Sequence, residues 1–332
     1  MKVFRRVALA MIGAALWTSL ALAAAPPPVC DGRDLTADPA VKPDYAAFAD
    51  DLVNDEGLLW KIEKPGVAPS FLYGTVHSTQ AAPIALMREA ARHLDEAKIV
   101  VTELGGPFDA SDKVNMSAAM LSASLSADVD TFSGELSGAD ADVVERYLAD
   151  HGYPKEMVHH LKLWFLAVGS TMPRCETEGK TADLPEVDET IAALGKASGL
   201  PVKGLETLQE QIDAIAATPP GLAARMLIAT ARRPDLEDDS YVTLLKLYTD
   251  KRPTRALAVV DAVPGLSAED RAAEREFTTL LLVGRNEVMA SRAAPYLASG
   301  GAFIAVGALH LSGKAGLVER FRAIGYRVTK IW

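Results

Sequence analysis

This chain carries one pattern at two distant points, Phe71-Leu72-Tyr73-Gly74-Thr75-Val76-His77 and Ile304-Ala305-Val306-Gly307-Ala308-Leu309-His310. Each copy is an apolar strand that ends in Gly-x-x-His and is followed by a predicted helix and a second strand. In the first copy the second strand, residues 98–104, is nearly continuous in β-branched side chains, which is typical of a strand buried on both faces. The pattern predicts two strand–Gly-x-x-His–helix–strand half-repeats in an α/β fold.

The remaining strands and helices can be predicted from the rest of the chain. Residues 58–62 and 70–76 read as a hairpin around the turn Pro65-Gly66, and residues 201–206 as a further strand. We expect a mixed central sheet flanked by helices, with a helical insertion between the half-repeats, as a single domain over residues 56–332. The helices are expected at residues 83–94, 139–148, 155–168, 187–198, 208–216, 222–248 with a break near 233–234, 268–296 and 316–323.

The N-terminus has the features of a secretory signal peptide over residues 1–23. Lys2, Arg5 and Arg6 precede an apolar run, and Ala21-Leu22-Ala23 is a small-x-small cleavage site. The alternative is an uncleaved membrane anchor, although the run is short for a bilayer span. Residues 24–55 show no sustained period and are expected to wrap the surface as a lead-in. We expect an exported protein, periplasmic or secreted, without a stable membrane span after cleavage.

Composition and charge exclude several classes of protein. The 332 residues are 49% hydrophobic and 23% charged, which is ordinary for a globular protein and unlike a disordered, collagen-like or cysteine-rich chain. The formal net charge of −10 becomes −13 when the signal peptide is removed. An acidic protein without long runs of Lys and Arg is unsuited to phosphate backbones, so we expect no nucleic-acid partner.

The chain has two cysteines, Cys30 and Cys175. They are too few and too far apart for a zinc ribbon or a thioredoxin-like pair. In an oxidising compartment a single disulfide between them is expected, and the alternative is two unrelated buried thiols.

Three residues at predicted strand ends suggest a metal site. In open α/β sheets ligands collect beyond the carboxyl ends of the strands, where His77, Glu103 and His310 are placed. Two imidazoles and one carboxylate suit a divalent metal that keeps open positions for water and substrate. The glycine three residues before each histidine is expected to let the backbone turn sharply. Taken singly, each residue also fits an ordinary hydrogen-bonded or surface position.

A series of short motifs runs along nearly the whole mature chain. In order, they are Leu59-Trp60-Lys61-Ile62, Gly74-Thr75-Val76-His77, Glu103-Leu104, Gly204-Leu205-Glu206-Thr207, Glu210-Gln211, Arg285-Asn286, Met289-Ala290, Val306-Gly307-Ala308-Leu309-His310-Leu311 and Gly325-Tyr326. Together they resemble the TraB/GumN family, which includes the TIKI-type metalloproteases. The resemblance implies a metallopeptidase-like fold distantly related to erythromycin esterases and ChaN-type haem-binding proteins. It also implies that the metal ligands are His77, Glu103 and His310.

Roles follow for these residues. A bound manganese, cobalt or zinc ion would polarise a substrate carbonyl and lower the pKa of a bound water. Glu103 is a candidate ligand or general base. Arg285 is a candidate for binding a substrate carboxylate or the oxyanion formed during attack, or else an ordinary helix-surface arginine. Glu206, at another strand end, is a candidate for orienting a ligand histidine. Asp188 and Glu189 stand at a predicted helix start, where negative charge is favoured in any case.

The sequence therefore predicts an exported metal-dependent hydrolase acting on a peptide or small-molecule substrate, with peptide or amide bonds as the expected target. The alternative is a binding protein on the same scaffold that sequesters a peptide or cofactor without turnover. The chain has no Gly-x-Ser-x-Gly elbow, no phosphate-binding Gly-Lys-Ser/Thr loop and no His-Glu-x-x-His helix.

Overall fold

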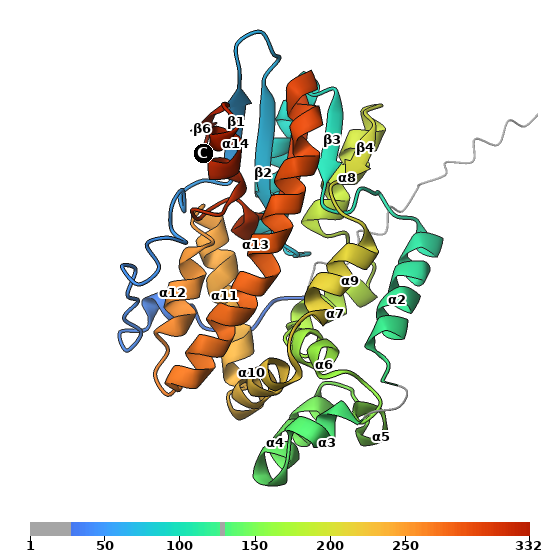
Figure 1. Ribbon diagram of the computed structural model, residues 1–332, viewed down its shortest axis with the longest axis vertical. Helices are drawn as coiled ribbons and strands as arrows, with labels where there is room; N and C mark the ends of the chain where they lie inside the picture. The colour runs from blue at the N-terminus through green and yellow to red at the C-terminus, as the bar shows by residue number, and fades with distance from the viewer. Residues whose placement is uncertain (1–27, 127–129) are drawn as a thin grey trace, which may run out of the picture.

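The computed structural model describes residues 28–126 and 130–332, and a six-stranded mixed sheet lies at its centre (Figure 1). The strand order is β4-β3-β5-β2-β1-β6. Strands β4, β3, β5 and β2 are parallel neighbours, and β1 is antiparallel to both β2 and β6. The expected α/β fold with a mixed central sheet flanked by helices is confirmed. That its halves are repeats of each other stays a prediction.

The strands and helices have the following bounds. The strands are β1 (Leu59–Glu63), β2 (Ser70–Thr75), β3 (Ile99–Thr102), β4 (Val202–Gly204), β5 (Ala302–Gly307) and β6 (Arg327–Lys330). The α-helices are α1 (Ala81–Ala90), α2 (Ala110–Ser124), α3 (Thr131–Glu135), α4 (Gly138–Asp150), α5 (Lys155–Val158), α6 (Leu163–Gly169), α7 (Arg174–Thr181), α8 (Val187–Ala197), α9 (Leu208–Ala216), α10 (Pro220–Arg232), α11 (Asp235–Thr249), α12 (Arg255–Asp261), α13 (Ala268–Ser299) and α14 (Leu317–Ala323), and the 3-10 helices are η1 (Leu35–Ala37), η2 (Ala91–Glu96) and η3 (Ala308–His310).

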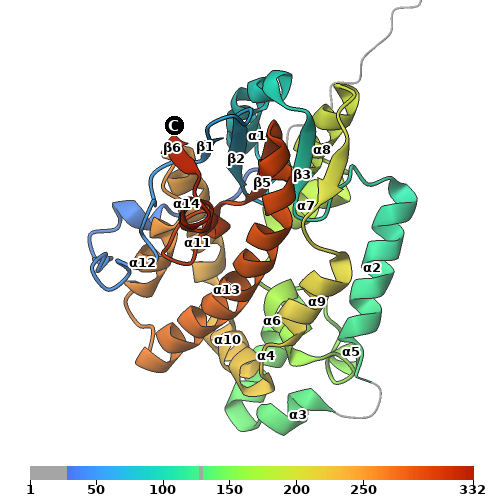
Figure 2. The same ribbon diagram turned by 45° about the horizontal axis from the view of Figure 1, so that its top comes forward.

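Helices cover both faces of the sheet, because alternate strand side chains are apolar on both sides. On one face Leu72, Val101 and Ile304 pack against α13 and α14. On the other face Phe71 and Phe303 pack against α1, α8 and α11. The sheet is therefore the middle layer of three, as Figures 1 and 2 show.

A separate helical region lies beyond the carboxyl ends of the parallel strands (Figure 1). Its apolar core joins α3, α4, α5, α6 and α10, and it includes Ala273 from α13. At 32 residues, α13 is long enough to run from this region to the sheet, which carries its middle past the strand ends (Figure 2). A capping box of Ser267 and Asp270 begins α13.

No single helix within the described ranges is long and apolar enough to cross a membrane. Only α9 and α10 taken together pass that test by length and composition, and they are bent by 82° relative to each other. The predicted signal peptide, residues 1–23, lies outside the described residues.

The predicted disulfide between Cys30 and Cys175 is confirmed, and it joins residues 145 positions apart. The lead-in from residue 28 to residue 55 has no α-helix or strand. It lies over α11 and α12, where Leu35 and Val41 are buried against the apolar side chains of these helices.

Most predicted elements are confirmed, including the β1–β2 hairpin and α9. The single helix predicted over residues 155–168 is wrong, because α5 ends at Val158 and α6 begins at Leu163. His159 lies in this break, where Nδ1 contacts a carboxylate oxygen of Asp130 at 2.9 Å. Helices α2, α3, α7 and α12 were not predicted.

Candidate functional site

The predicted site residues follow the carboxyl ends of four neighbouring parallel strands. Glu206 follows β4, Glu103 follows β3, His310 follows β5 and His77 follows β2. Because parallel strands end at one edge of a sheet, these residues, although far apart in sequence, all lie at the same edge.

Glu103 lies at the centre of this edge and is buried. Its Oε1 accepts a hydrogen bond of 2.7 Å from the Gly307 backbone N–H. Its Oε2 accepts one of 2.7 Å from Arg285 and one of 3.0 Å from Gln211. These donors hold the carboxylate in a fixed orientation at the end of β3.

Arg285, from the middle of α13, joins Glu103 to Glu206. Its Nε and Nη2 donate to the Glu206 carboxylate at 3.0 and 2.7 Å, and Nη2 also donates to Glu103. Gln211 donates to Glu206 as well, at 3.2 Å. In the part of the chain that the structure describes, Glu206 contacts neither histidine. The arginine is engaged by two carboxylates, so this geometry favours a role in holding Glu103 over a role in binding substrate.

Opposing effects determine the protonation of Glu103 and His310. Burial raises the pKa of Glu103, but nearby positive charge and the Gly307 N–H outweigh burial and lower it to about 2. Burial lowers the pKa of His310 to about 4, so its imidazole is neutral at pH 7. With His310 neutral at pH 7, the positive charges that favour the ionised form of Glu103 are Arg285, which contacts it, and His77.

Asn286 orients His310. Oδ1 of Asn286 lies 2.6 Å from Nδ1 of His310, while its Nδ2 donates to the Ala315 carbonyl oxygen at 3.0 Å. Since Nδ2 is used as the donor, Oδ1 faces the ring and Nδ1 must carry the proton. Nε2 then holds a lone pair and lies 3.8 Å from Oε1 of Glu103. Among the described residues Nε2 has no hydrogen-bond partner, so it is available as a metal ligand.

His77 lies apart from this cluster, and 64% of its side chain is exposed. Its Nδ1 lies 3.4 Å from Oδ2 of Asp188, which raises the pKa of His77 to about 9. Asp188 is at the start of α8 as predicted, but it also accepts a 2.6 Å hydrogen bond from Thr75 in β2. A role for it near His77 was not predicted.

Within residues 28–126 and 130–332, no three His, Cys, Asp or Glu side chains form a group that could hold a metal. The structure brings His310 to Glu103 and turns His77 toward Asp188. Metal binding by all three residues stays a prediction.

The glycines of the two Gly-x-x-His motifs do not act as sharp turns, so that prediction is wrong. Neither Gly74 nor Gly307 has a positive φ. A Cβ on Gly74 would lie 3.0 Å from Cα of Ala308, and one on Gly307 would lie 3.3 Å from Oε1 of Glu103. Glycine is needed at both positions because other chain segments approach closely.

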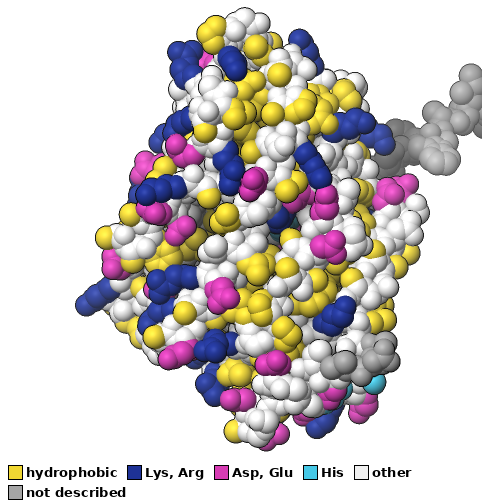
Figure 3. Space-filling model, viewed as in Figure 1, with side chains coloured by type: hydrophobic (Ala, Val, Ile, Leu, Met, Phe, Trp, Pro, Cys, Tyr) yellow, Lys and Arg dark blue, Asp and Glu magenta, His cyan; other side chains and the backbone are white. Residues whose placement is uncertain are grey.

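A cavity of about 120 Å³ opens beside the cluster. Glu103, His77 and Asp188 line one part, and Phe108 and Met116 line an apolar part near α2. The cavity has both charged and apolar walls, as substrate sites usually do. On the face of the molecule in Figure 3, acidic and basic side chains are interspersed.

Besides Asp188 near His77, sequence reasoning missed the roles of Asn286 and Gln211. Both lie within motifs that carried the family resemblance, next to Arg285 and Glu210, and their position there was the available signal.

Comparison with known proteins gives one match. The model of the TraB/PrgY/gumN family matches residues 58–330, which is most of the chain. No curated protein and no solved structure matches.

Proposed function

Because this chain belongs to the TraB/PrgY/gumN family, we propose that it is an exported metal-dependent hydrolase that cleaves peptide or amide bonds. The observation that carries the proposal is the pairing of Nε2 of His310 with Oε1 of Glu103. Both atoms are hydrogen-bond acceptors and lie 3.8 Å apart, and the Nδ1 proton of His310 is hydrogen-bonded to Asn286. Two buried lone pairs that face each other are stabilised by a cation between or beside them.

The donor chemistry of this pair fits a divalent metal. His310 and Glu103 would hold it, with His77 as the third ligand after its side chain turns from Asp188. Manganese, cobalt and zinc all accept imidazole and carboxylate ligands. When bound, such an ion polarises a carbonyl and lowers the pKa of water.

The chain's own residues supply the remaining functions. Arg285 and Gln211 keep Glu103 ionised and oriented, so it can act as a ligand or accept a proton from water. Asn286 keeps Nε2 of His310 unprotonated. Phe108 and Met116 give the cavity an apolar wall for a substrate side chain.

One observation favours a second candidate, a periplasmic or secreted protein that binds a peptide or cofactor without turnover. His77 is exposed and paired with Asp188 rather than with Glu103 and His310. If that arrangement persists with ligand bound, the site lacks its third metal ligand.

Elemental analysis after chelation and reloading with manganese, cobalt or zinc tests the first proposal. We expect near-stoichiometric metal in the wild-type protein and in the surface variant His160→Ala, and none in the double variant His77→Ala/His310→Ala. A peptide-library screen of the loaded protein then separates the two candidates. Negligible metal in all three proteins contradicts the metallohydrolase, and peptide binding without cleavage by wild type and His77→Ala alike supports the binding protein.

A further inference from the structure

A buried carboxylate outside the site holds the loop that carries His77. Glu176, in α7, has no exposed surface. Its Oε1 accepts from the Ser78 hydroxyl at 2.8 Å, and its Oε2 accepts from the Thr79 N–H and hydroxyl at 2.8 and 2.9 Å. Glu176 thus binds the two residues that follow His77.

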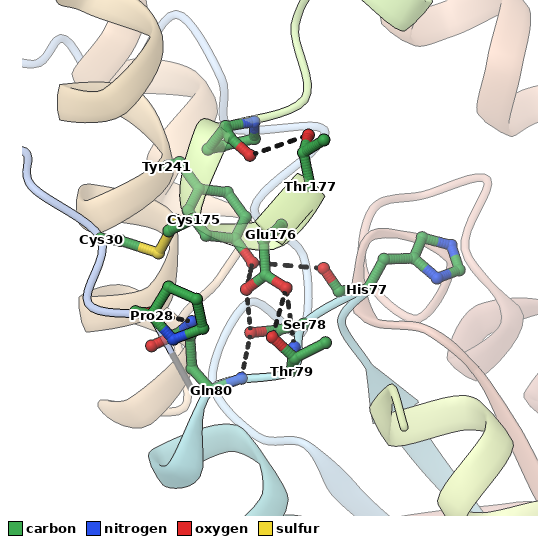
Figure 4. The surroundings of a disulfide bond; sticks show 11 residues. Pro28, Cys30, His77, Ser78, Thr79, Gln80, Cys175, Glu176, Thr177 and Tyr241 are labelled. Carbon is green, nitrogen blue, oxygen red and sulfur yellow. Dashed lines mark hydrogen bonds between the residues drawn. A yellow bond between two sulfur atoms is a disulfide. The ribbon is translucent and has the colours of Figure 1, made fainter. Parts of the chain in front are cut away.

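Tyr241, in α11, completes this cluster. Its hydroxyl lies 2.5 Å from Oε1 of Glu176 and 3.2 Å from the carbonyl oxygen of His77. Figure 4 shows the His77 carbonyl directed to Tyr241, while the imidazole extends away from the cluster. The contacts therefore fix the backbone of His77 and leave its ring free to enter the site.

Glu176 has no ion pair with a Lys, Arg or His side chain of the described residues. Four neutral donors replace the water that a carboxylate loses on burial. Gly179 in the same helix allows α7 to lie close to the loop that follows His77, because a Cβ at position 179 would lie 2.4 Å from Oγ1 of Thr79. Burying a carboxylate is costly unless its oxygens are hydrogen-bonded. Because both oxygens of Glu176 have hydrogen-bond donors only in this arrangement, the carboxylate favours one conformation of the loop.

The disulfide is attached at the neighbouring residue. Cys175 precedes Glu176 and is bonded to Cys30, which lies in the segment Pro28–Leu35, here called the strap (Figure 4). The strap also accepts a hydrogen bond from Gln80 through the Pro28 carbonyl, and Arg33 donates to Asp239 of α11 at 2.6 and 3.0 Å. It therefore ties together the His77 loop and the helices that supply Glu176 and Tyr241. The strap precedes residues 58–330, the range that the family model matches.

We propose that Glu176 is a positioning residue for His77, and that the Cys30–Cys175 disulfide, through the strap, holds Glu176 in place. Without these contacts the loop from His77 to Gln80 would sample other conformations, and the imidazole would be less often available at the site. The consequence for metal binding rests on the proposed function, whereas the consequence for loop order does not.

The main test compares Glu176→Gln with Glu178→Gln, a matched control in the same helix whose side chain is exposed and pairs with Arg174. A glutamine has one acceptor oxygen and an NH2 group in place of two acceptor oxygens, so two of the four donors around Glu176 lose their acceptor. Hydrogen exchange is measured without metal, and cobalt affinity is measured separately. We expect exchange at Ser78–Gln80 to accelerate about tenfold or more in Glu176→Gln, and cobalt affinity to fall about tenfold, with neither change in Glu178→Gln.

Reduction tests the role of the disulfide. A dithiol reductant transfers two electrons and two protons to the bond, giving two thiols and an oxidised reductant. In the wild-type protein we expect reduction to accelerate exchange at Ser78–Gln80. In Glu176→Gln the further effect should be small, because both changes break the same chain of contacts. Fully additive effects would overturn the link between the disulfide and Glu176.

Other outcomes also decide the matter. Unchanged exchange at Ser78–Gln80, or acceleration by one common factor throughout the protein, overturns the positioning role. If Glu176→Gln does not fold, Tyr241→Phe removes a single donor and should give the same local pattern at smaller amplitude. A wild-type protein that binds no cobalt contradicts the proposed function, and the exchange pattern still decides the role of Glu176.

Discussion

Oδ1 of Asn286 lies 2.6 Å from Nδ1 of His310, and this contact selects the tautomer of the buried histidine. Asn286 is itself 2% exposed and fixed by its bond to Ala315. The relationship makes His310 a neutral imidazole whose Nε2 lone pair lies on the side of Glu103.

Asn286→Ala is expected to release this tautomer. Without the acceptor at Nδ1, the proton can move to Nε2, where it would point toward the negatively charged Glu103 carboxylate 3.8 Å away. Long-range ¹H–¹⁵N spectra of the metal-free protein should show Nδ1 protonated in wild type and a shift toward Nε2 in the variant. We also expect metal affinity to fall about 10- to 100-fold. Asn115→Ala, in exposed α2, is the control, and an unchanged His310 tautomer in Asn286→Ala would contradict the assignment.

Arg285→Met is expected to destabilise the protein by about 3–5 kcal/mol, because it leaves two buried carboxylates, Glu103 and Glu206, without their cation. Arg292→Met, in the same helix, removes an exposed and solvent-screened pair with Glu210 and should cost much less stability. Urea unfolding measures both. Adding Glu206→Gln to Arg285→Met should recover stability, because it removes one of the two unpaired carboxylates. Equal losses for the two arginine variants would contradict a stabilising role for Arg285 between Glu103 and Glu206.

Glu103 should make the metal-free protein less stable in acid. Its pKa is about 2 in the folded protein and 4.5 in the unfolded chain, so folding favours the ionised form. This contribution is complete above pH 4.5 and is lost as the pH falls toward 2, at up to about 1.4 kcal/mol per pH unit. Urea titrations between pH 5 and pH 3 should give a shallower pH dependence in Glu103→Gln than in wild type or Glu178→Gln. Identical slopes would show that Glu103 titrates normally.

The fold was predictable where burial is apolar and periodic. β2, β3 and β5 are apolar runs, and each was predicted as a strand from that pattern. Helix α7 was missed because Cys175, Glu176 and Gly179 are its buried residues. A disulfide, hydrogen bonds and close backbone approach bury this helix, and none of these produces a hydrophobic period.

The placement of the candidate site residues at strand ends was predictable, but their side-chain contacts were not. Strand-end placement correctly brought Glu103 and His310 together, since that depends on sheet topology alone. Which carboxylate Arg285 binds, and whether His77 faces Glu103 or Asp188, depends on side-chain directions and on helix α13 crossing the strand ends. The spacing of residues along the sequence does not determine which side chains contact each other in this way.

Gly74→Ala should be destabilising, in contrast to Gly284→Ala. The new methyl group at position 74 would lie 3.0 Å from Cα and Cβ of Ala308, so η3, which carries His310, must move. We expect a loss of about 1–3 kcal/mol and weaker metal binding. At Gly284, an exposed position of α13 next to Arg285, a Cβ meets no atom within 4 Å among the described residues, and alanine should stabilise the helix by about 0.5–1 kcal/mol. Urea unfolding and cobalt titration of both variants test the contrast. Equal stability and affinity would mean that β2 and η3 can separate without disturbing the site.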